Sequence, residues 1–299
     1  MEVKLEKEKI RDNIRALFYI FLFTLINVYI PVLNIIVFFV WPIPIVYILV
    51  KYGMNNAFKI IIISALINGL LISPLIGLIT IIGFGFIGFV IGGCLQEKLS
   101  PFKTLISSVL VVLISQSLIL LISYQFLGLD YNYFISEIER LLSQSGQFSE
   151  FEEIIKLQLQ LIKQIFPALL IISSTVTGII SYYITLWYLN KKEFDFKIFT
   201  PVRYWHFPRW IVSIGIVISL LFKFNSILYN LNIMLFFICL VQGFAVGLYY
   251  ISKRNGSKIF RLIYFLAIFF IPLLPVVLIV LGLVDMWFNI RGLNDISSE

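Results

Sequence analysis

Charged residues are scarce in this sequence. Asp, Glu, Lys and Arg make up 13% of its 299 residues, whereas 60% are hydrophobic, and the mean hydropathy is +1.00. A water-soluble domain usually carries about 25% charged residues. The composition therefore excludes an ordinary soluble protein. It predicts an all-α, polytopic bundle of transmembrane helices.

Residues for catalysis and metal binding are equally few. The chain has one histidine, His206, and two cysteines, Cys94 and Cys239, which lie within or at the edge of apolar runs. Their spacing gives neither a disulfide framework nor a set of metal ligands. No G-x-S-x-G, H-E-x-x-H or Walker motif occurs. The sequence therefore predicts no enzyme activity, no metal and no cofactor.

Ionisable residues are also missing from the centres of the apolar runs. Proton-coupled carriers and pumps usually keep such a residue at mid-membrane, so we expect no energy source within this chain. Neutral polar residues occur there instead, and interhelical hydrogen bonds are their first interpretation. The alternative is that a subset lines a pocket for a small polar or amphipathic solute. That subset is Asn68, Gln116, Thr175, Thr177 and Gln242.

The charge-free runs give the positions of the helices, because a helix needs about 20 apolar residues to cross the hydrocarbon core. Pro31 and the pair Ser73 and Pro74 divide two of the longer runs. Nine helices are predicted, at about 16–30, 33–50, 57–72, 75–94, 104–127, 165–189, 208–224, 228–251 and 261–284.

Lysine and arginine fall mainly on one side of these nine crossings. The positive-inside rule then predicts a bacterial plasma-membrane protein with a cytoplasmic amino terminus and an external carboxyl terminus. The same bias argues that the short helix at 208–224 crosses. This orientation explains the net charge of +7, so nucleic acid is not an expected partner.

One polar insert, residues 129–164, is predicted on the outside. It carries six acidic residues against three basic ones. Ser149 and Glu152 form a capping-box pattern, after which apolar residues on one face predict an amphipathic helix that continues into the sixth span. Packing on the membrane or the bundle is its first interpretation, and docking of a partner is the alternative.

No linker divides the chain. Residues 1–292 are therefore predicted as a single membrane domain. Within it, residues 1–15 form a basic cytoplasmic tail, and residues 293–299 follow as a carboxyl-terminal tail.

Residues 83–93, GFGFIGFVIGG, contain the spacing G-x-G-x-x-G at Gly83, Gly85 and Gly88. This spacing is typical of dinucleotide-binding loops, but only between a strand and a helix. Here it lies inside a predicted membrane helix with no downstream acidic residue to hold a ribose. The cofactor interpretation is therefore rejected.

Small residues in a membrane helix instead favour close helix packing. Gly85, Gly88 and Gly92 are predicted to lie against a neighbouring helix. The sixth predicted helix is the expected partner, because Ser174 and Gly178 provide small residues on its own surface.

Two aromatic and basic clusters lie near predicted helix ends. PVRYWHFPRW, residues 201–210, contains His206 and is interpreted as an anchor at the cytoplasmic interface. Near the carboxyl terminus, Asp285 and Arg291 flank Trp287. They are interpreted as a cap and anchor at the outer end of the last helix.

These segments also give the chain a family resemblance. IFPALLIISS at 165–174, PVRYWHFPRW at 201–210 and GLVDMWFNIR at 282–291 occur together with the glycine-rich helix and the basic turn after it. In combination they resemble the YybS-like family of uncharacterised bacterial membrane proteins. The resemblance covers about residues 16–292.

The first six predicted helices are also similar in number and layout to the S components of energy-coupling-factor transporters. That resemblance implies a bundle that captures a vitamin or a metal ion. The chain departs from those proteins in its outer insert and its three extra helices. It also has Ile20 four residues after Ala16, where S components commonly carry an A-x-x-x-A docking face.

The sequence therefore predicts a transport-related, solute-binding bundle without its own energy source. The alternative is a non-transporting scaffold or regulator of cell-envelope processes. The expected partners are the lipid bilayer, a small polar or amphipathic solute and a membrane-protein partner.

Overall fold

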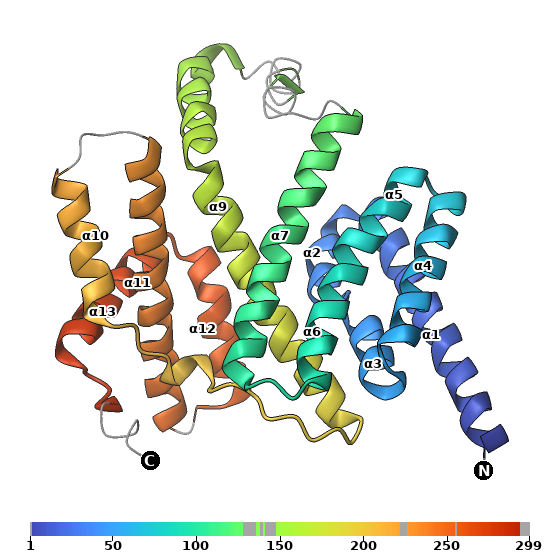
Figure 1. Cartoon of the computed structure of the whole chain (residues 1–299). Helices are drawn as coiled ribbons and strands as arrows, with labels where there is room; N and C mark the ends of the chain where they lie inside the picture. The colour runs from blue at the N-terminus through green and yellow to red at the C-terminus, as the bar shows by residue number, and fades with distance from the viewer. Residues whose placement is uncertain are drawn as a thin grey trace. The chain divides into compact units, whose positions relative to one another are not determined.

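The computed structural model describes residues 2–127, 136, 137, 140, 148–221, 226–254 and 256–293 (Figure 1). Helices dominate these residues and no strand occurs among them, so the all-α prediction is confirmed. The chain forms two compact units. Unit 1 comprises Met1–Phe151 and Ser173–Phe199, and unit 2 comprises Glu152–Ile172 and Thr200–Glu299.

Six helices or broken helices among the described residues are long and apolar enough to cross a membrane. They are Val32–Tyr52, Met54–Leu71, Pro74–Gln96, Pro101–Phe126, Leu157–Lys191 and Ser226–Lys253. The polytopic membrane character predicted from the composition is thereby confirmed.

Unit 1 follows the predicted helices closely, with two of them broken. Its elements are α1 (Glu2–Tyr29), α2 (Pro31–Val40), α3 (Ile43–Tyr52), α4 (Met54–Leu71), α5 (Pro74–Ile79), the π-helix η1 (Thr80–Gly85), α6 (Phe86–Gln96), α7 (Pro101–Leu127) and the second part of α9 (Phe148–Lys191). As predicted, the helix that begins in the outer insert continues into the sixth span. Several residues of the insert, including 141–147, lie outside the described residues.

The predicted breaks have clear local causes. Pro31 occupies the first turn of α2, where its missing N–H costs nothing. Ser73 caps α5 by accepting a hydrogen bond from the backbone N–H of Ile76. Gly53, between α3 and α4, has φ of 86°, a conformation that residues with a side chain rarely adopt.

Residues 2–15 are not a separate tail. They form the first half of α1, and the predicted helix at 16–30 is its apolar second half. Asp12, Ala16 and Ile20 are all buried on one face of α1. Ala16 and Ile20 pack in a core cluster with Ile45 of α3 and other apolar residues of α3 and α4.

The glycines of the GFGFIGFVIGG segment lie inside the broken span from α5 to α6. A Cβ atom on Gly88 would lie 2.7 Å from Cβ of Ile45, and one on Gly92 would lie 3.1 Å from Cβ of Leu49. Both glycines therefore pack on α3. Gly178 of α9 lies instead against Val109 of α7, whose Cα would be 2.6 Å from an added Cβ. Gly88 and Gly178 therefore have different neighbours, so the expectation that these two glycines face each other is wrong.

Unit 2 contains the first part of α9, a short 3-10 turn η2 (Val202–Tyr204), α10 (Arg209–Leu221), α11 (Ser226–Lys253), α12 (Lys258–Phe270) and α13 (Leu274–Phe288). With 13 residues, α10 measures only about 20 Å, too short to cross the hydrocarbon core alone.

Residues 200–208, the irregular stretch before α10, continue the path of α10 along α11. Ser219 of α10 donates a hydrogen bond to Asn232 near the start of α11. The backbone N–H of Phe207 donates to Gln242, and the ring of Tyr204 contacts the ring of Tyr249. Residues 200–221 therefore run antiparallel to α11 over nearly its whole length.

The continuous helix predicted at 261–284 is broken in the structure. Two helices, α12 and α13, replace it and meet at an angle of 113°. The break lies at Ile271–Leu273, where Pro272 cannot continue a helix. Tyr264 of α12 contacts α11 at Gly243, and the hydroxyl of Tyr250 donates to the carbonyl of Ile290 just after α13. Because α12 begins at Lys258, soon after α11 ends at Lys253, and Ile290 lies against Tyr250, the pair leaves the carboxyl end of α11 and returns to it.

This return changes the expected topology. Arg291 hydrogen-bonds the backbone carbonyl of Arg203, although the nine-crossing scheme placed these two residues on opposite sides of the membrane. We expect both termini of the chain on the side of the basic loops.

Epitope tags fused to each terminus in turn test this topology. In intact spheroplasts neither tag should react with an impermeant antibody, and both should react after permeabilisation. A carboxyl-terminal tag that reacts in intact spheroplasts would instead support a single crossing by residues 261–284.

Candidate functional site

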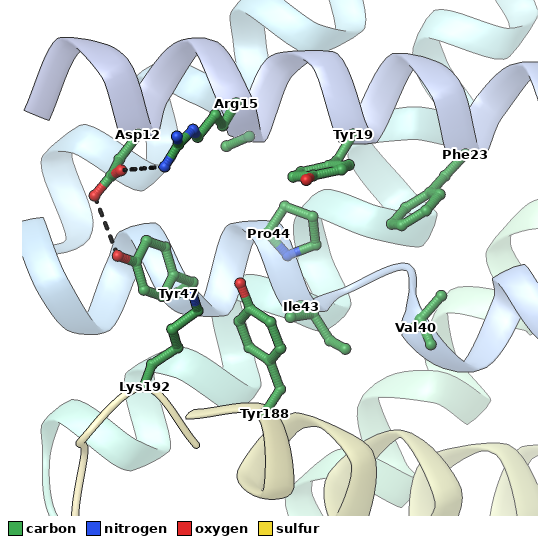
Figure 2. A pocket seen from close by; sticks show the side chains of 11 residues that line it. Asp12, Arg15, Tyr19, Phe23, Val40, Ile43, Pro44, Tyr47, Tyr188 and Lys192 are labelled. Carbon is green, nitrogen blue, oxygen red and sulfur yellow. Dashed lines mark hydrogen bonds and ion pairs between the residues drawn. The ribbon is translucent and has the colours of Figure 1, made fainter. Parts of the chain in front are cut away.

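A cavity of about 370 Å³ lies in unit 1 between α1, α3 and the end of α9 (Figure 2). One end is polar and the other is apolar and aromatic. The cavity is lined by Asp12, Arg15, Ala16, Tyr19, Phe23, Val40, Ile43, Pro44, Tyr47, Tyr188 and Lys192.

The polar end is organised by Asp12, which is 5% exposed. Its Oδ2 atom accepts hydrogen bonds from Lys51 Nζ at 2.8 Å, from the Tyr52 hydroxyl at 2.8 Å and from the Tyr47 hydroxyl at 3.1 Å. Lys51 also donates to Glu8 at 2.7 Å. Helical spacing produces this cluster, because Glu8 and Asp12 share one face of α1 and Tyr47 and Lys51 share one face of α3.

Asp12 is held in its charged form. Burial raises the pKa of its carboxyl group, but the hydrogen bonds from Lys51, Tyr52 and Tyr47 outweigh that effect and hold the pKa below its ordinary value. The Lys51 ammonium balances the negative charge. The cluster therefore fixes α1 to α3 and shapes the polar end of the cavity.

The other end of the cavity is apolar. Figure 2 shows the rings of Tyr19 and Phe23 along one wall and Pro44 and Ile43 along another. The ring of Tyr188, from α9, meets that of Tyr47 edge-on, with centroids 6.3 Å apart. Such walls suit a flat or aliphatic group.

The rim of the cavity is basic. The Arg15 side chain is 62% exposed and lies 3.9 Å from Oδ1 of Asp12. Lys192 is exposed, with its ammonium 5.9 Å from the centre of the Tyr188 ring. Lys51 is shared by Glu8 and Asp12, and Arg15 is also ion-paired with Asp12. With Lys192 these groups are two carboxylates and three cations, so a net positive charge remains at the rim.

The polar residues predicted to line a pocket lie elsewhere. Asn68 donates to the hydroxyls of Thr24 and Thr80, each at 2.9 Å, and joins α1, α4 and η1. Gln116 of α7 accepts from Ser174 of α9 at 2.6 Å.

The other three residues predicted to line a pocket also lie away from this cavity. Thr175 and Thr177 lie on α9, where Thr177 is buried, and Gln242 belongs to unit 2. None of the five predicted residues lines the cavity of Figure 2.

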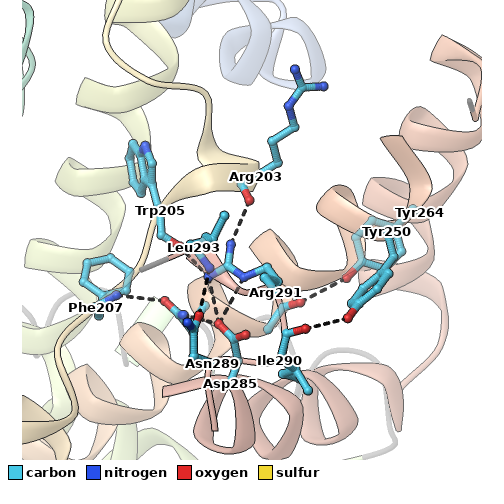
Figure 3. A network of polar contacts seen from close by, with 12 residues as sticks. Arg203, Trp205, Phe207, Tyr250, Tyr264, Asp285, Asn289, Ile290, Arg291 and Leu293 are labelled. Atoms are coloured by element: carbon cyan, nitrogen blue, oxygen red, sulfur yellow. Dashed lines mark hydrogen bonds and ion pairs between the residues drawn. The ribbon is translucent and has the colours of Figure 1, made fainter. Parts of the chain in front are cut away.

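Unit 2 contains a buried polar network around Asp285 and Arg291, which were predicted only to cap and anchor the last helix (Figure 3). Arg291 donates to the carbonyls of Arg203 and Trp205 at 2.7 and 2.6 Å, and it forms an ion pair with Asp285 at 2.8 Å. Gln242 donates to the same carboxylate. The side chains of Arg291 and Asp285 are both fully buried.

This network has a structural role. The irregular backbone before α10 exposes carbonyl groups that no helix satisfies, and the Arg291 guanidinium supplies their donors. The flanking positions of Asp285 and Arg291 were visible in the sequence. The partners of Arg291 in residues 203–205 were not visible there, because those contacts depend on the return of α13 towards the end of α11.

The fold and the two polar clusters define a polytopic α-helical membrane protein. A family model described as "Predicted membrane protein (DUF2232)" matches residues 16–286, so the chain belongs to this family. It is also similar to the uncharacterised protein YybS of Bacillus subtilis strain 168, with 26% identity over 288 residues. That alignment covers 90% of this chain and 93% of the relative. No solved structure matches the chain.

Replacing Asp12 by Asn should destabilise unit 1. The change removes the charge that Lys51 faces and weakens three hydrogen bonds, so we expect the free energy of unfolding to fall by about 1–3 kcal/mol. Thermal unfolding in detergent measures the change. Glu8→Gln removes the more exposed partner of the same lysine and should have little effect. Equal losses in the two variants would contradict a central role for Asp12.

The same carboxyl group predicts a pH dependence. Its pKa is lower in the folded than in the unfolded state, so its stabilisation is fully present above the unfolded-state pKa of about 3.9. It is lost as the pH falls through the folded-state pKa. Below pH 4 the wild-type protein should therefore lose stability more steeply than the Asp12→Asn variant, measured as unfolding midpoints across pH. Parallel curves would show that another group controls the acid transition.

Replacing Arg291 by Lys should destabilise unit 2. A lysine keeps the charge but cannot reach Asp285 and two carbonyls with one planar group. We expect a loss of about 1–3 kcal/mol in the free energy of unfolding. Arg254→Lys, at an exposed position in the same unit, is the matched control. If both variants unfold at the wild-type denaturant midpoint, the network does not stabilise the unit.

Proposed function

We propose that this protein is a membrane-embedded binding protein for a small amphipathic solute, acting in a transport process that it does not energise. The cavity between α1, α3 and α9 is the observation that carries the proposal. Its volume of about 370 Å³ falls within the range of small-molecule sites, about 300–1,000 Å³.

The lining indicates the chemistry of the solute. Tyr19, Phe23 and Pro44 suit a flat or aliphatic body. Asp12 already accepts three hydrogen bonds, so it has little capacity left for a cationic ligand. Arg15 and Lys192 at the rim favour an anionic group, for which both supply charged donors. The solute class that fits is an apolar or aromatic body with one acidic group.

The distribution of charge supports a passive role. Each lysine within the six candidate spans lies towards an end of its span, and no Asp, Glu, Lys or Arg lies at a span centre. Proton-driven carriers usually keep ionisable groups at that depth. An energising partner would then be a separate protein.

Ligand-dependent stabilisation tests the proposal. The purified protein in lipid nanodiscs is heated with a panel of aromatic carboxylates, such as indole-3-acetate, and with matching amines, such as tryptamine. We expect at least one carboxylate to raise the unfolding midpoint, since a ligand at 100 times its Kd adds about 2.7 kcal/mol. The matching amine should have no such effect.

Variants locate the binding. Arg15→Gln combined with Lys192→Gln should abolish the shift, whereas Lys191→Gln, which removes an adjacent cation outside the cavity, should keep it. Native mass spectrometry of the gently solubilised protein adds a direct readout of any retained small molecule. No shift with any probe and no retained molecule, together with a stably bound protein subunit, would instead favour the scaffold function.

A further inference from the structure

A second cavity, of about 300 Å³, lies in unit 2 where the irregular stretch before α10 meets the last turns of α11. It is independent of the solute cavity in unit 1. Arg203, Tyr204, Tyr249, Ser252 and Lys253 line it. No acidic residue belongs to this lining.

Two polar atoms at this cavity are buried without a partner in the described part of the chain. They are Nε of Arg203 and the hydroxyl oxygen of Ser252. Leaving such a group unpaired costs about 1–3 kcal/mol, and native structures rarely tolerate it without a ligand or water. Both residues line the same cavity, so one bound group can satisfy them together.

The Arg203 side chain is positioned for this role by its backbone. Arg291 holds the Arg203 carbonyl at 2.7 Å, and the Arg203 side chain points away from that network (Figure 3). Its guanidinium carbon lies 4.8 Å from the centre of the Tyr204 ring. Lys253 adds a second, exposed cation. No ion pair is formed by either cation within the described residues.

The depth of the cavity indicates where its ligand comes from. Lys253 ends α11, which is long and apolar enough to span the membrane. Tyr204, Tyr249 and Tyr250 cluster at this end, as aromatic residues do at the level of lipid headgroups.

We propose that this cavity binds a phosphate group. Arg203 and Lys253 supply charge, and the Ser252 hydroxyl and Arg203 Nε–H supply buried donors, which together match a phosphate monoanion or diester. A phosphate of this kind belongs either to an anionic phospholipid headgroup or to a soluble phosphate compound. The position at the membrane interface favours the lipid.

Native mass spectrometry tests the site with defined lipids. The protein is released from nanodiscs of phosphatidylglycerol or of phosphatidylcholine, and the retained lipids are counted. We expect one tightly held phosphatidylglycerol on the wild-type protein. The apparent affinity for phosphatidylglycerol should fall about tenfold in Arg203→Gln combined with Lys253→Gln, because this variant loses charge-assisted hydrogen bonds to the phosphate. Arg254→Gln, a neighbouring exposed cation outside the lining, should bind as the wild type.

A second arm separates the two sources. Inorganic phosphate is added to the delipidated protein in neutral detergent, and stabilisation of the wild type but not of the double variant would assign the site to a soluble phosphate. Ser252→Ala removes only one small donor and should weaken binding while the protein still elutes as a folded species. Unchanged lipid retention and an unchanged phosphate response in both the double variant and Ser252→Ala would overturn the proposal.

Discussion

A lipid bilayer offers no hydrogen-bond partner to irregular backbone, and both units of this protein contain irregular backbone that must be satisfied from within. In unit 1 the π-helix η1 interrupts the span from α5 to α6, and Ser115 of α7 donates to the carbonyl of Ile82 at 2.7 Å. In unit 2, Arg291 donates hydrogen bonds to the carbonyls of Arg203 and Trp205. Both irregular stretches thus lie where a side chain from a neighbouring segment supplies a hydrogen-bond donor.

The same requirement shapes the two cavities. Breaks in a membrane helix often mark functional sites, because they leave space and polar groups at depth. The broken pair of α2 and α3 supplies Val40, Ile43 and Pro44 to the cavity in unit 1. The irregular stretch before α10 supplies Arg203 to the cavity in unit 2. Each cavity lies beside a cluster in which a carboxylate is already neutralised, so the remaining cations set its charge.

Much of the helical organisation could be predicted from the sequence. Charge-free runs and the prolines at positions 31 and 74 located most helices to within a few residues. The same criterion would have found the break at Pro272, but the length of the run at 261–284 suggested one crossing. The prediction of an external carboxyl terminus followed from treating residues 261–284 as one crossing. The contact between Arg291 and Arg203 instead places these two residues on the same side of the membrane.

The candidate sites were harder to predict. Counting lysine and arginine treated residues 1–15 as a tail, although Glu8 and Asp12 at helical spacing could have indicated a buried face. Neutral polar residues such as Asn68 and Gln116 have partners fixed by tertiary packing, which local patterns do not encode. Family membership was predicted correctly, because the three motifs that indicate it are short sequence segments that need no knowledge of tertiary packing.

A structure of the protein determined in lipid nanodiscs, at a resolution that shows side chains, would test the solute-binding function most directly. The account predicts density for a compact ligand between Tyr19, Pro44 and Tyr188, with its acidic group facing Arg15 and Lys192. A cavity closed by repacked side chains, with Asp12 no longer bound to Lys51, would contradict it.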